Sequence, residues 1–232
     1  LETSDQYDEN LEIFVYYRIR RDANFETASN SEIQPYNSIY LKPSKLMIVD
    51  QYIRKTAQEI TKGKTSTDEK ARAIYDYVFD NVDYDKETPG WGRGDTKRVC
   101  SIGKGNCTDF HSLFISLARA SGIPSRFEIG FQIPEEREGS IGGYHCWSQF
   151  YADDKGWITV DISEAWKNPS KKEFYFGGFD PNKFMLTRGR DIELEPKQQN
   201  SVLNYFFYPH IELSDGSTIK PVTEFSYRDT SV

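Results

Sequence analysis

Three residues with complementary chemistry follow one another along this chain of 232 residues. Cys107 comes directly after Gly105-Asn106, where a turn opens an apolar helix. Unpaired N–H groups and the positive end of the helix dipole lower the pKa of a thiol placed there, which favours the nucleophilic thiolate. Downstream, His145 supplies a base and Asp161 a carboxylate that can orient it. Together the three residues indicate a Cys-His-Asp triad for acyl transfer.

The helix that carries the cysteine has clear limits. Apolar residues recur at helical spacing after Cys107, and the helix should stop at Gly122 and Pro124. Glycine allows the left-handed cap and proline cannot continue the helix. Backbone N–H groups at the helix start, including that of Cys107, point toward the place where an oxyanion would form. The indole N–H of Trp91, in the preceding glycine-rich loop 89–94, is a candidate second donor or site wall.

A hairpin should bring the other two residues together. The strand-like segments 144–152 and 157–162 are joined by the turn Asp153 to Gly156 and therefore pair antiparallel. His145 lies on one strand and Asp161 on the other, so they become cross-strand neighbours if their faces coincide. The register of the pairing decides this, and the sequence leaves it open.

The remaining segments form a scaffold around this unit. Alternation predicts a strand over 11–19, and a helix should run from a cap at Ser44 to about Thr61. A capping box at Ser66 to Glu69 opens a further helix. The other strand-like segments are 126–133, 173–179, 202–213 and 222–227, with a turn at 215–216.

Composition excludes two classes of partner. The net charge is −7 and no block of lysine and arginine compensates locally, so a nucleic-acid partner is not expected. No run of roughly eighteen apolar residues exists, so no membrane span is predicted. The first ten residues lack the pattern of a signal peptide, which is equally expected of the mature end of an exported protein.

Each candidate residue also has a simpler explanation. A free cysteine is most often a buried structural thiol, a histidine in an apolar strand is often a core residue, and Asp161 could merely begin a turn. The combined layout of helix and hairpin favours the triad over these separate explanations. With Cys107 as the working thiol, Cys100 and Cys146 are either paired or both reduced.

Asp109 and His111 lie on the first turn and a half of the same helix. His111 is four residues after Cys107 and shares its face, which raises the possibility of a metal pair. A zinc site needs three or four ligands, and the chain has three histidines and three cysteines without a Cys-x-x-Cys pair. We therefore expect no metal, and assign Asp109 and His111 to bracing the site by hydrogen bonds.

Several stretches resemble the signature blocks of the transglutaminase-like superfamily, in its bacterial form, over about residues 66 to 194. They are GNCTDFH at 105–111, SGIPSR at 121–126, YHCW at 144–147 and WITVD at 157–161. The resemblance implies a papain-like α+β fold in which the nucleophile's helix packs on an antiparallel sheet. It also implies Cys107 as nucleophile, His145 as general base and acid, and Asp161 as the orienting residue. Nothing here resembles the calcium-binding insertions of the animal cross-linking enzymes, so no cofactor is expected.

The sequence therefore predicts a catalytic core at 44–194, an N-terminal β extension at 1–43 and a C-terminal β extension at 195–232. The expected function is a cysteine peptidase or amidase that hydrolyses peptide or glutamine-type amide bonds. One alternative is a transglutaminase that passes the acyl group to an amine, and another is a non-catalytic module that binds peptides or glycans. The expected substrates are peptides or proteins, including material from the cell wall or from glycoproteins. The resemblance alone implies a periplasmic or secreted location.

Overall fold

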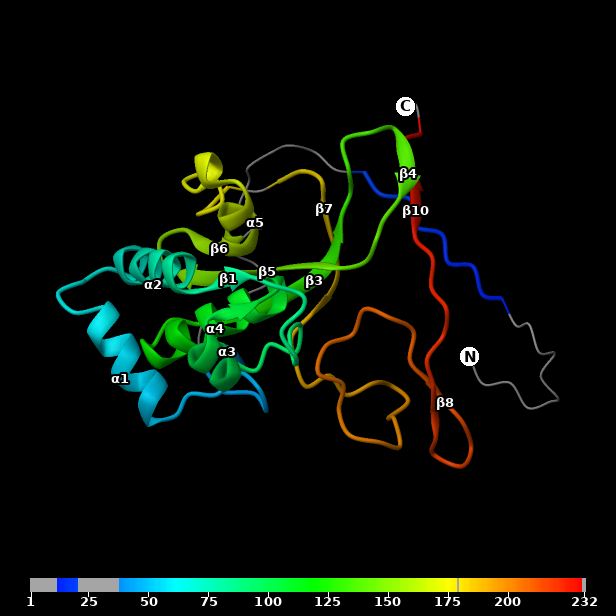
Figure 1. The fold of residues 1–232 in the computed structure, drawn as a ribbon, viewed down its shortest axis with the longest axis horizontal. Coiled ribbons are helices and arrows are strands. Elements are labelled where there is room, and N and C mark those ends of the chain that lie inside the picture. Colours follow the sequence, from blue (N-terminus) through cyan, green and yellow to red (C-terminus); the bar gives the residue numbers. More distant parts are fainter. Residues whose placement is uncertain (1–11, 21–37, 179, 231–232) are drawn as a thin grey trace.

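The computed structural model describes residues 12–20, 38–178 and 180–230. Its helices are α1 (Gln51–Ile60), α2 (Thr67–Asn81), α3 (Thr96–Ile102), α4 (Cys107–Ala120) and α5 (Ile162–Lys167), with short 3-10 turns η2 (Ser38–Tyr40) and η3 (Pro169–Lys171). Its strands are β1 (Asp83–Tyr84), β2 (Lys104–Gly105), β3 (Ser125–Gln132), β4 (Glu138–Ser140), β5 (His145–Ala152), β6 (Gly156–Val160), β7 (Lys183–Arg188), β8 (Ile211–Glu212), β9 (Thr218–Ile219) and β10 (Ser226–Arg228). Figure 1 shows α1 to α4 gathered at one end of the molecule and the β4–β10 ribbon at the other.

A four-stranded antiparallel sheet, in the order β6-β5-β3-β7, carries the core. Helix α4 packs against β5 and β3, and its residues are buried from Cys107 through Ala118. A helix that is buried on all sides belongs to the centre of a domain rather than to its surface. The predicted α+β fold, with the cysteine helix on an antiparallel sheet, is confirmed.

The helix starts follow from their caps. The capping box at Ser66 forms as predicted, because the Ser66 side chain accepts from Glu69 N and the Glu69 carboxylate accepts from Ser66 N. The predicted start of the first helix at Ser44 is wrong. Helix α1 begins only at Gln51, since the Asp50 side chain accepts from Ile53 N at 2.9 Å. Ser44 instead closes a local turn, where its hydroxyl accepts from Met47 N.

The predicted strand over 11–19 is wrong for its described part. Residues 12–20 form neither helix nor strand, and Leu11 lies outside the described residues. Neither of the two alternating faces is buried, since Ile13 is 60 % exposed and its neighbour Phe14 is 68 % exposed. An alternating pattern produces a strand only where a partner takes its hydrogen bonds and a core takes one face. The division of the chain at 43 and 194 stays a prediction.

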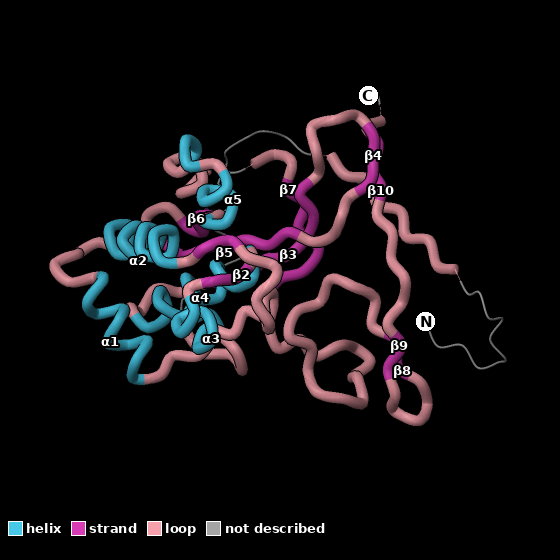
Figure 2. Tube along the Cα trace, in the orientation of Figure 1, coloured by secondary structure: helices cyan, strands magenta, loops and turns pink. Residues whose placement is uncertain are grey.

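The C-terminal aromatic segments cover the sheet rather than extend it. Phe207 and Phe225 pack edge-on against Phe131 of β3, with ring centroids 4.9 and 5.0 Å apart from it. Regular structure is short here, as Figure 2 shows: β8 and β9 form a small hairpin around the predicted turn at 215–216, and β10 pairs with β4. The segment 173–178 supplies only an isolated bridge to β6, and residue 179 lies outside the described residues. The strand that does extend the sheet is β7, which the sequence patterns did not predict.

Phe114 tests the central position of α4, because its side chain is fully buried and packs against Phe150 of β5. We expect Phe114→Ala to lower the free energy of unfolding by about 3–5 kcal/mol, since it opens a cavity in the core. The matched control Phe14→Ala removes an exposed ring and should change the free energy of unfolding by no more than about 0.5 kcal/mol. Urea unfolding followed by fluorescence measures both. Equal effects of the two substitutions would contradict this account of the core.

Candidate active site

The start of α4 is built to hold Cys107 at the first helical position. Asn106 is the N-cap, and its side chain accepts from Thr108 N at 2.9 Å. Asp109 completes the capping box by accepting from Asn106 N at 2.9 Å. The backbone N–H of Cys107 has no acceptor within its helix, as is usual for the first residue of a helix. This N–H is therefore available to a bound group.

The Cys107 thiol lies in a buried setting that nonetheless favours the thiolate. Only 2 % of the residue is exposed. Burial alone would raise the pKa of Cys107, but hydrogen bonds with the side chains of Cys146 and His145, and the charge of His145, hold the pKa well below the usual range of a thiol. Cys107 and His145 thus each favour the charged form of the other, and their roles as nucleophile and base stay a prediction.

His145 is held by Asp161. Its Nε2 lies 2.6 Å from Asp161 Oδ2, which leaves Nδ1 as the nitrogen that faces Cys107. Burial by itself lowers the pKa of His145, but the charge of Asp161 and its hydrogen bond raise the pKa to about 9, with a further contribution from Cys107. These pKa shifts favour a thiolate beside an imidazolium ion near neutral pH.

The hairpin register explains how Asp161 reaches His145. Strands β5 and β6 pair Gln149 with Thr159 and Tyr151 with Trp157, so the odd-numbered residues of both strands share one face of the sheet. Asp161 follows β6 directly and serves as the N-cap of α5, where its Oδ1 accepts from Glu164 N at 3.0 Å. The carboxylate therefore orients a helix with one oxygen and the histidine with the other.

A lysine that the sequence reasoning missed completes this group. Lys183 Nζ lies 2.5 Å from Asp161 Oδ2, and the lysine side chain has no exposed surface. Burial opposes ionisation of Asp161, but Lys183 first and His145 second hold the pKa of Asp161 well below its usual range. The sequence around it gave no signal, because the segment Lys183–Arg188 does not alternate and was not predicted to be a strand.

His111 braces the site in its neutral form. Its Nδ1 lies 2.7 Å from the carbonyl oxygen of Cys107, so Nδ1 carries the proton and donates it. Its Nε2 accepts from Ile162 N at 3.1 Å. Burial lowers the pKa of His111 to about 4, in spite of the opposite pull of Asp161. The ring thus joins the first turn of α4 to the first residue of α5.

Asp109 ties the glycine-rich loop to the start of α4. Besides Asn106 N, its buried carboxylate accepts from Gly92 N at 2.6 Å and from Gly94 N at 3.0 Å. Burial raises the pKa of Asp109, and these backbone donors act in the opposite direction. Gly105 has no side chain for a steric reason, because a Cβ there would overlap the Asp109 side chain.

Trp91 lies in the loop that Asp109 anchors, and it is 38 % exposed. Its described contacts are a backbone bond to Thr88 and the cation of Lys86 over its ring, 6.0 Å from the centroid. None of these contacts brings the indole N–H to Cys107. The use of Trp91 as an oxyanion donor therefore stays a prediction.

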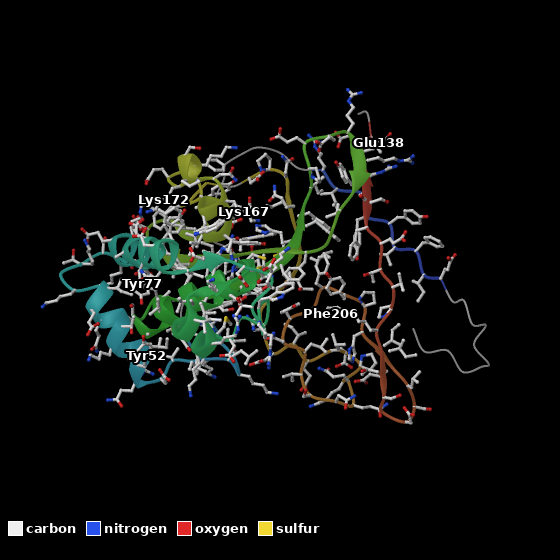
Figure 3. The ribbon with its side chains drawn as sticks, in the orientation of Figure 1. Tyr52, Tyr77, Glu138, Lys167, Lys172 and Phe206 are labelled. Atoms are coloured by element: carbon white, nitrogen blue, oxygen red, sulfur yellow. The ribbon has the colours of Figure 1, made fainter. Side chains whose placement is uncertain are left out.

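A group of aromatic side chains surrounds Tyr84, on which the Cys107 thiolate acts. Tyr84 packs beside Phe110 and Trp166, with ring centroids 6.2 and 6.3 Å away. Lys167, which is labelled in Figure 3 at the end of α5, places its Nζ 4.4 Å from the centroid of the Tyr84 ring. Burial first, and the Cys107 thiolate second, raise the pKa of Tyr84 to about 12. Tyr84 and Lys167 are thus candidate wall residues that the sequence reasoning did not name.

All three cysteines are free thiols. Cys100 is half-buried on α3, whereas Cys146 lies on β5 beside α4, so the two are not paired. The Cys146 Sγ donates to Thr108 Oγ1 at 3.6 Å and also forms a hydrogen bond with Cys107. Burial raises the pKa of Cys146 well above its usual range, as does its contact with Cys107. Cys146 is therefore a protonated thiol beside Cys107.

The described residues contain neither a cluster of metal ligands nor a membrane-spanning helix. Within the ranges 12–20, 38–178 and 180–230, no three histidine, cysteine, aspartate or glutamate side chains gather as ligands of a metal ion would. No helix in the same ranges is both long enough and apolar enough to cross a membrane.

One segment of the chain matches a known family. Residues 54–162 match the family described as the Transglutaminase-like superfamily. An uncharacterized protein of Haemophilus influenzae is 28 % identical over 207 residues, which cover 75 % of this chain and 56 % of that protein. A candidate cysteine protease of Cytophaga hutchinsonii is a structural neighbour with 25 % identity and a TM-score of 0.46, over 60 % of this chain and 46 % of that one.

The periplasmic domain of TgpA from Pseudomonas aeruginosa is a further structural neighbour. It is 18 % identical with a TM-score of 0.41, over 58 % of this chain and 48 % of that domain. The chain thus spans about half the length of each of these three proteins.

The three thiols should differ in reactivity. We expect iodoacetamide to label Cys107 first near neutral pH, because its thiolate is favoured. Burial raises the pKa of Cys100 to about 11, and Cys146 is held protonated, so both should react slowly. Peptide mass spectrometry over a time course measures the order, with the unfolded protein as control. Equal, slow labelling of all three thiols in the folded protein would count against the site.

The pH dependence of this labelling should report the ion pair. The Cys107 alkylation rate should persist well below the pH at which a free thiol loses reactivity, and should change again near pH 9 as the His145 ring loses its proton. In Asp161→Asn the ring loses its anionic partner, so the upper inflection should move down by about one pH unit or more. An upper inflection that stays near pH 9 in this variant would show that Asp161 does not control His145.

Proposed function

This chain carries a transglutaminase-like core over residues 54–162, and on that premise we propose that it is a cysteine-dependent acyl-transfer enzyme. The favoured reaction is hydrolysis of peptide or glutamine-type amide bonds, as in a peptidase or amidase. One observation carries the proposal: His145 Nε2 lies 2.6 Å from Asp161 Oδ2, and His145 and Cys107 shift each other's pKa in the directions that favour an imidazolium ion and a thiolate. The three proposed catalytic residues thus lie in the order nucleophile, base and orienting carboxylate.

In the first half of the proposed reaction, the Cys107 thiolate attacks the carbonyl carbon of the amide. A carbon–sulfur bond forms, and the negative charge moves to the carbonyl oxygen. The N–H of Cys107 is the donor best placed to bind that oxyanion, because it is unpaired at the start of α4. The His145 imidazolium then passes its Nδ1 proton to the leaving nitrogen as the carbon–nitrogen bond breaks.

In the second half, the neutral His145 ring acts as a base. It takes a proton from water while the water oxygen attacks the thioester carbon. The carbon–sulfur bond breaks, the acid leaves, and Cys107 returns as a thiolate beside the protonated ring. Asp161 stays ionised throughout and holds the ring by its Nε2–H.

The acyl acceptor decides between hydrolysis and cross-linking. We favour water because the resemblance points to bacterial members that hydrolyse. An amine acceptor would make the protein a transglutaminase through the same thioester. Peptides or proteins, possible cell-wall or glycoprotein fragments included, are the proposed substrates. A periplasmic or secreted location belongs to the same proposal and rests on the resemblance.

A single assay separates these outcomes. We expect incubation with a library of glutamine-containing peptides and a labelled primary amine to give cleaved or deamidated peptides, without incorporation of the amine. Cys107→Ala should abolish the reaction, and Asp161→Asn should slow it by about 10²–10⁴-fold. Cys100→Ala, which removes a thiol outside the site, should leave the rate unchanged. Mass spectrometry reads all three products.

Two results would overturn parts of the proposal. Amine incorporation that depends on Cys107 would replace hydrolysis by transglutamination. Full activity in Cys107→Ala would remove the cysteine mechanism altogether.

A further inference from the structure

Lys183 is a buried cation that the proposed reaction does not use. It is the first residue of β7, its side chain has no exposed surface, and its Nζ lies 2.5 Å from Asp161 Oδ2. The faces of two rings enclose the ammonium group, with the centroids of Trp147 and Tyr175 5.5 and 5.4 Å away. A lysine is almost never buried without a partner, and aromatic faces stabilise a desolvated cation. The geometry therefore fixes the ammonium group against one carboxylate oxygen.

The same oxygen holds the histidine. His145 Nε2 lies 2.6 Å from Asp161 Oδ2, so the ammonium and the imidazole are both one hydrogen-bond length from a single atom. The other oxygen, Oδ1, accepts from Ser163 Oγ and from Glu164 N, each at 3.0 Å. Neither cation can move to Oδ1 without displacing the cap of α5. The two cations therefore share Oδ2.

The remaining titratable groups around the pair do not supply a second permanent cation. His111 Nε2 lies 3.6 Å from Asp161 Oδ1, but its tautomer is neutral because Nε2 accepts from a backbone N–H. The other titratable groups that act on Asp161 or His145 are Cys107 on α4, Cys146 on β5, Tyr75 on α2 and Tyr175 after η3. Among the described residues, Lys183 is the only lysine or arginine in an ion pair with Asp161.

We propose that Lys183 is a positioning residue that limits how tightly Asp161 holds the protonated His145 ring. The inference rests on the function proposed above for its purpose, since an acid must release its proton to the leaving group. A buried carboxylate with no other partner would stabilise the imidazolium ion too strongly. A carboxylate that shares its charge with an ammonium stabilises it less. Lys183 forms and breaks no covalent bond in the reaction.

A purely structural role would have different consequences. In that case Lys183 would only compensate the buried charge of Asp161, and its loss would lower stability without a specific effect on the ring. The two roles differ in the pH at which His145 loses its proton. Removal of a nearby positive charge makes protonation of the ring easier, so the His145 midpoint should rise.

The test is an NMR titration of the histidine rings in the full chain, which has only three histidines. In Lys183→Met the His145 midpoint should rise by about one pH unit or more relative to the parent protein. Lys183→Gln, which can still donate a hydrogen bond but carries no charge, should show the same rise. Lys183→Arg should restore the midpoint toward the parent value. Lys155→Met is the control, because it removes an exposed lysine of the β5–β6 turn that pairs with Asp68 and not with a triad residue.

An unchanged or lowered His145 midpoint in the neutral variants would overturn the proposal. If neither neutral variant folds, the unaltered protein decides: the ¹⁵Nζ signal of Lys183, identified by its loss in Lys183→Arg, should shift as His145 titrates. A signal that does not respond to the His145 titration would refute the shared oxygen.

The titration is independent of turnover, so the two proposals can fail separately. A raised His145 midpoint in Lys183→Met, with no activity of the parent protein on any peptide, would support the positioning role and remove the proposed function. Activity of the parent protein that depends on Cys107, together with an unchanged His145 midpoint in Lys183→Met, would support the proposed function and remove the positioning role.

Discussion

The buried carboxylate of Asp161 is the interaction on which most of the site depends. A carboxylate without exposed surface must have both oxygens filled, or its charge would be too costly to bury. Oδ1 caps α5 and Oδ2 holds one cation from β5 and one from β7. Three elements, α5, β5 and β7, thereby meet at one group. The His145 ring is held in its position because it is one of the hydrogen-bond partners of the Asp161 carboxylate.

The site is part of the core rather than an addition to its surface. Helix α4 is buried through its first three turns, and that stretch includes polar side chains with no exposed surface, among them Thr108, Asp109 and His111. Each polar group has a partner on a neighbouring segment, as a buried polar group requires. A protein of this kind cannot repack α4 without disturbing the chemistry at its first residue. The close packing of the core therefore also fixes the position of the Cys107 thiol.

The sequence was sufficient to predict those elements whose structure depends on a few adjacent residues. The cysteine helix, the capping box at Ser66 and the turn that joins β5 to β6 could all be predicted from a few adjacent residues. The hairpin also predicted that His145 and Asp161 would be neighbours, and only the register had to come from the structure.

Features that depend on distant partners could not be predicted in this way. Among the described residues, no strand pairs with the alternating segment 12–19. Asp50 rather than Ser44 caps α1, because its side chain accepts from Ile53 N. The ion pair of Lys183 with Asp161 forms only because β7 lies at the edge of the sheet beside β3. A charged residue in an aromatic, irregular part of the sequence gave no local reason to be assigned to the core.

The tether between Asp109 and the glycine-rich loop has a thermodynamic consequence. Three backbone N–H groups, from Gly92, Gly94 and Asn106, converge on one carboxylate, so the loop and the helix start are ordered before any ligand arrives. Both of the loop glycines have left-handed backbone conformations, with φ of 75° and 62°, which other residues rarely adopt. Ordering a flexible segment upon association costs conformational entropy. That entropy is lost here during folding, so a molecule that binds beside Cys107 meets a surface whose shape is already set.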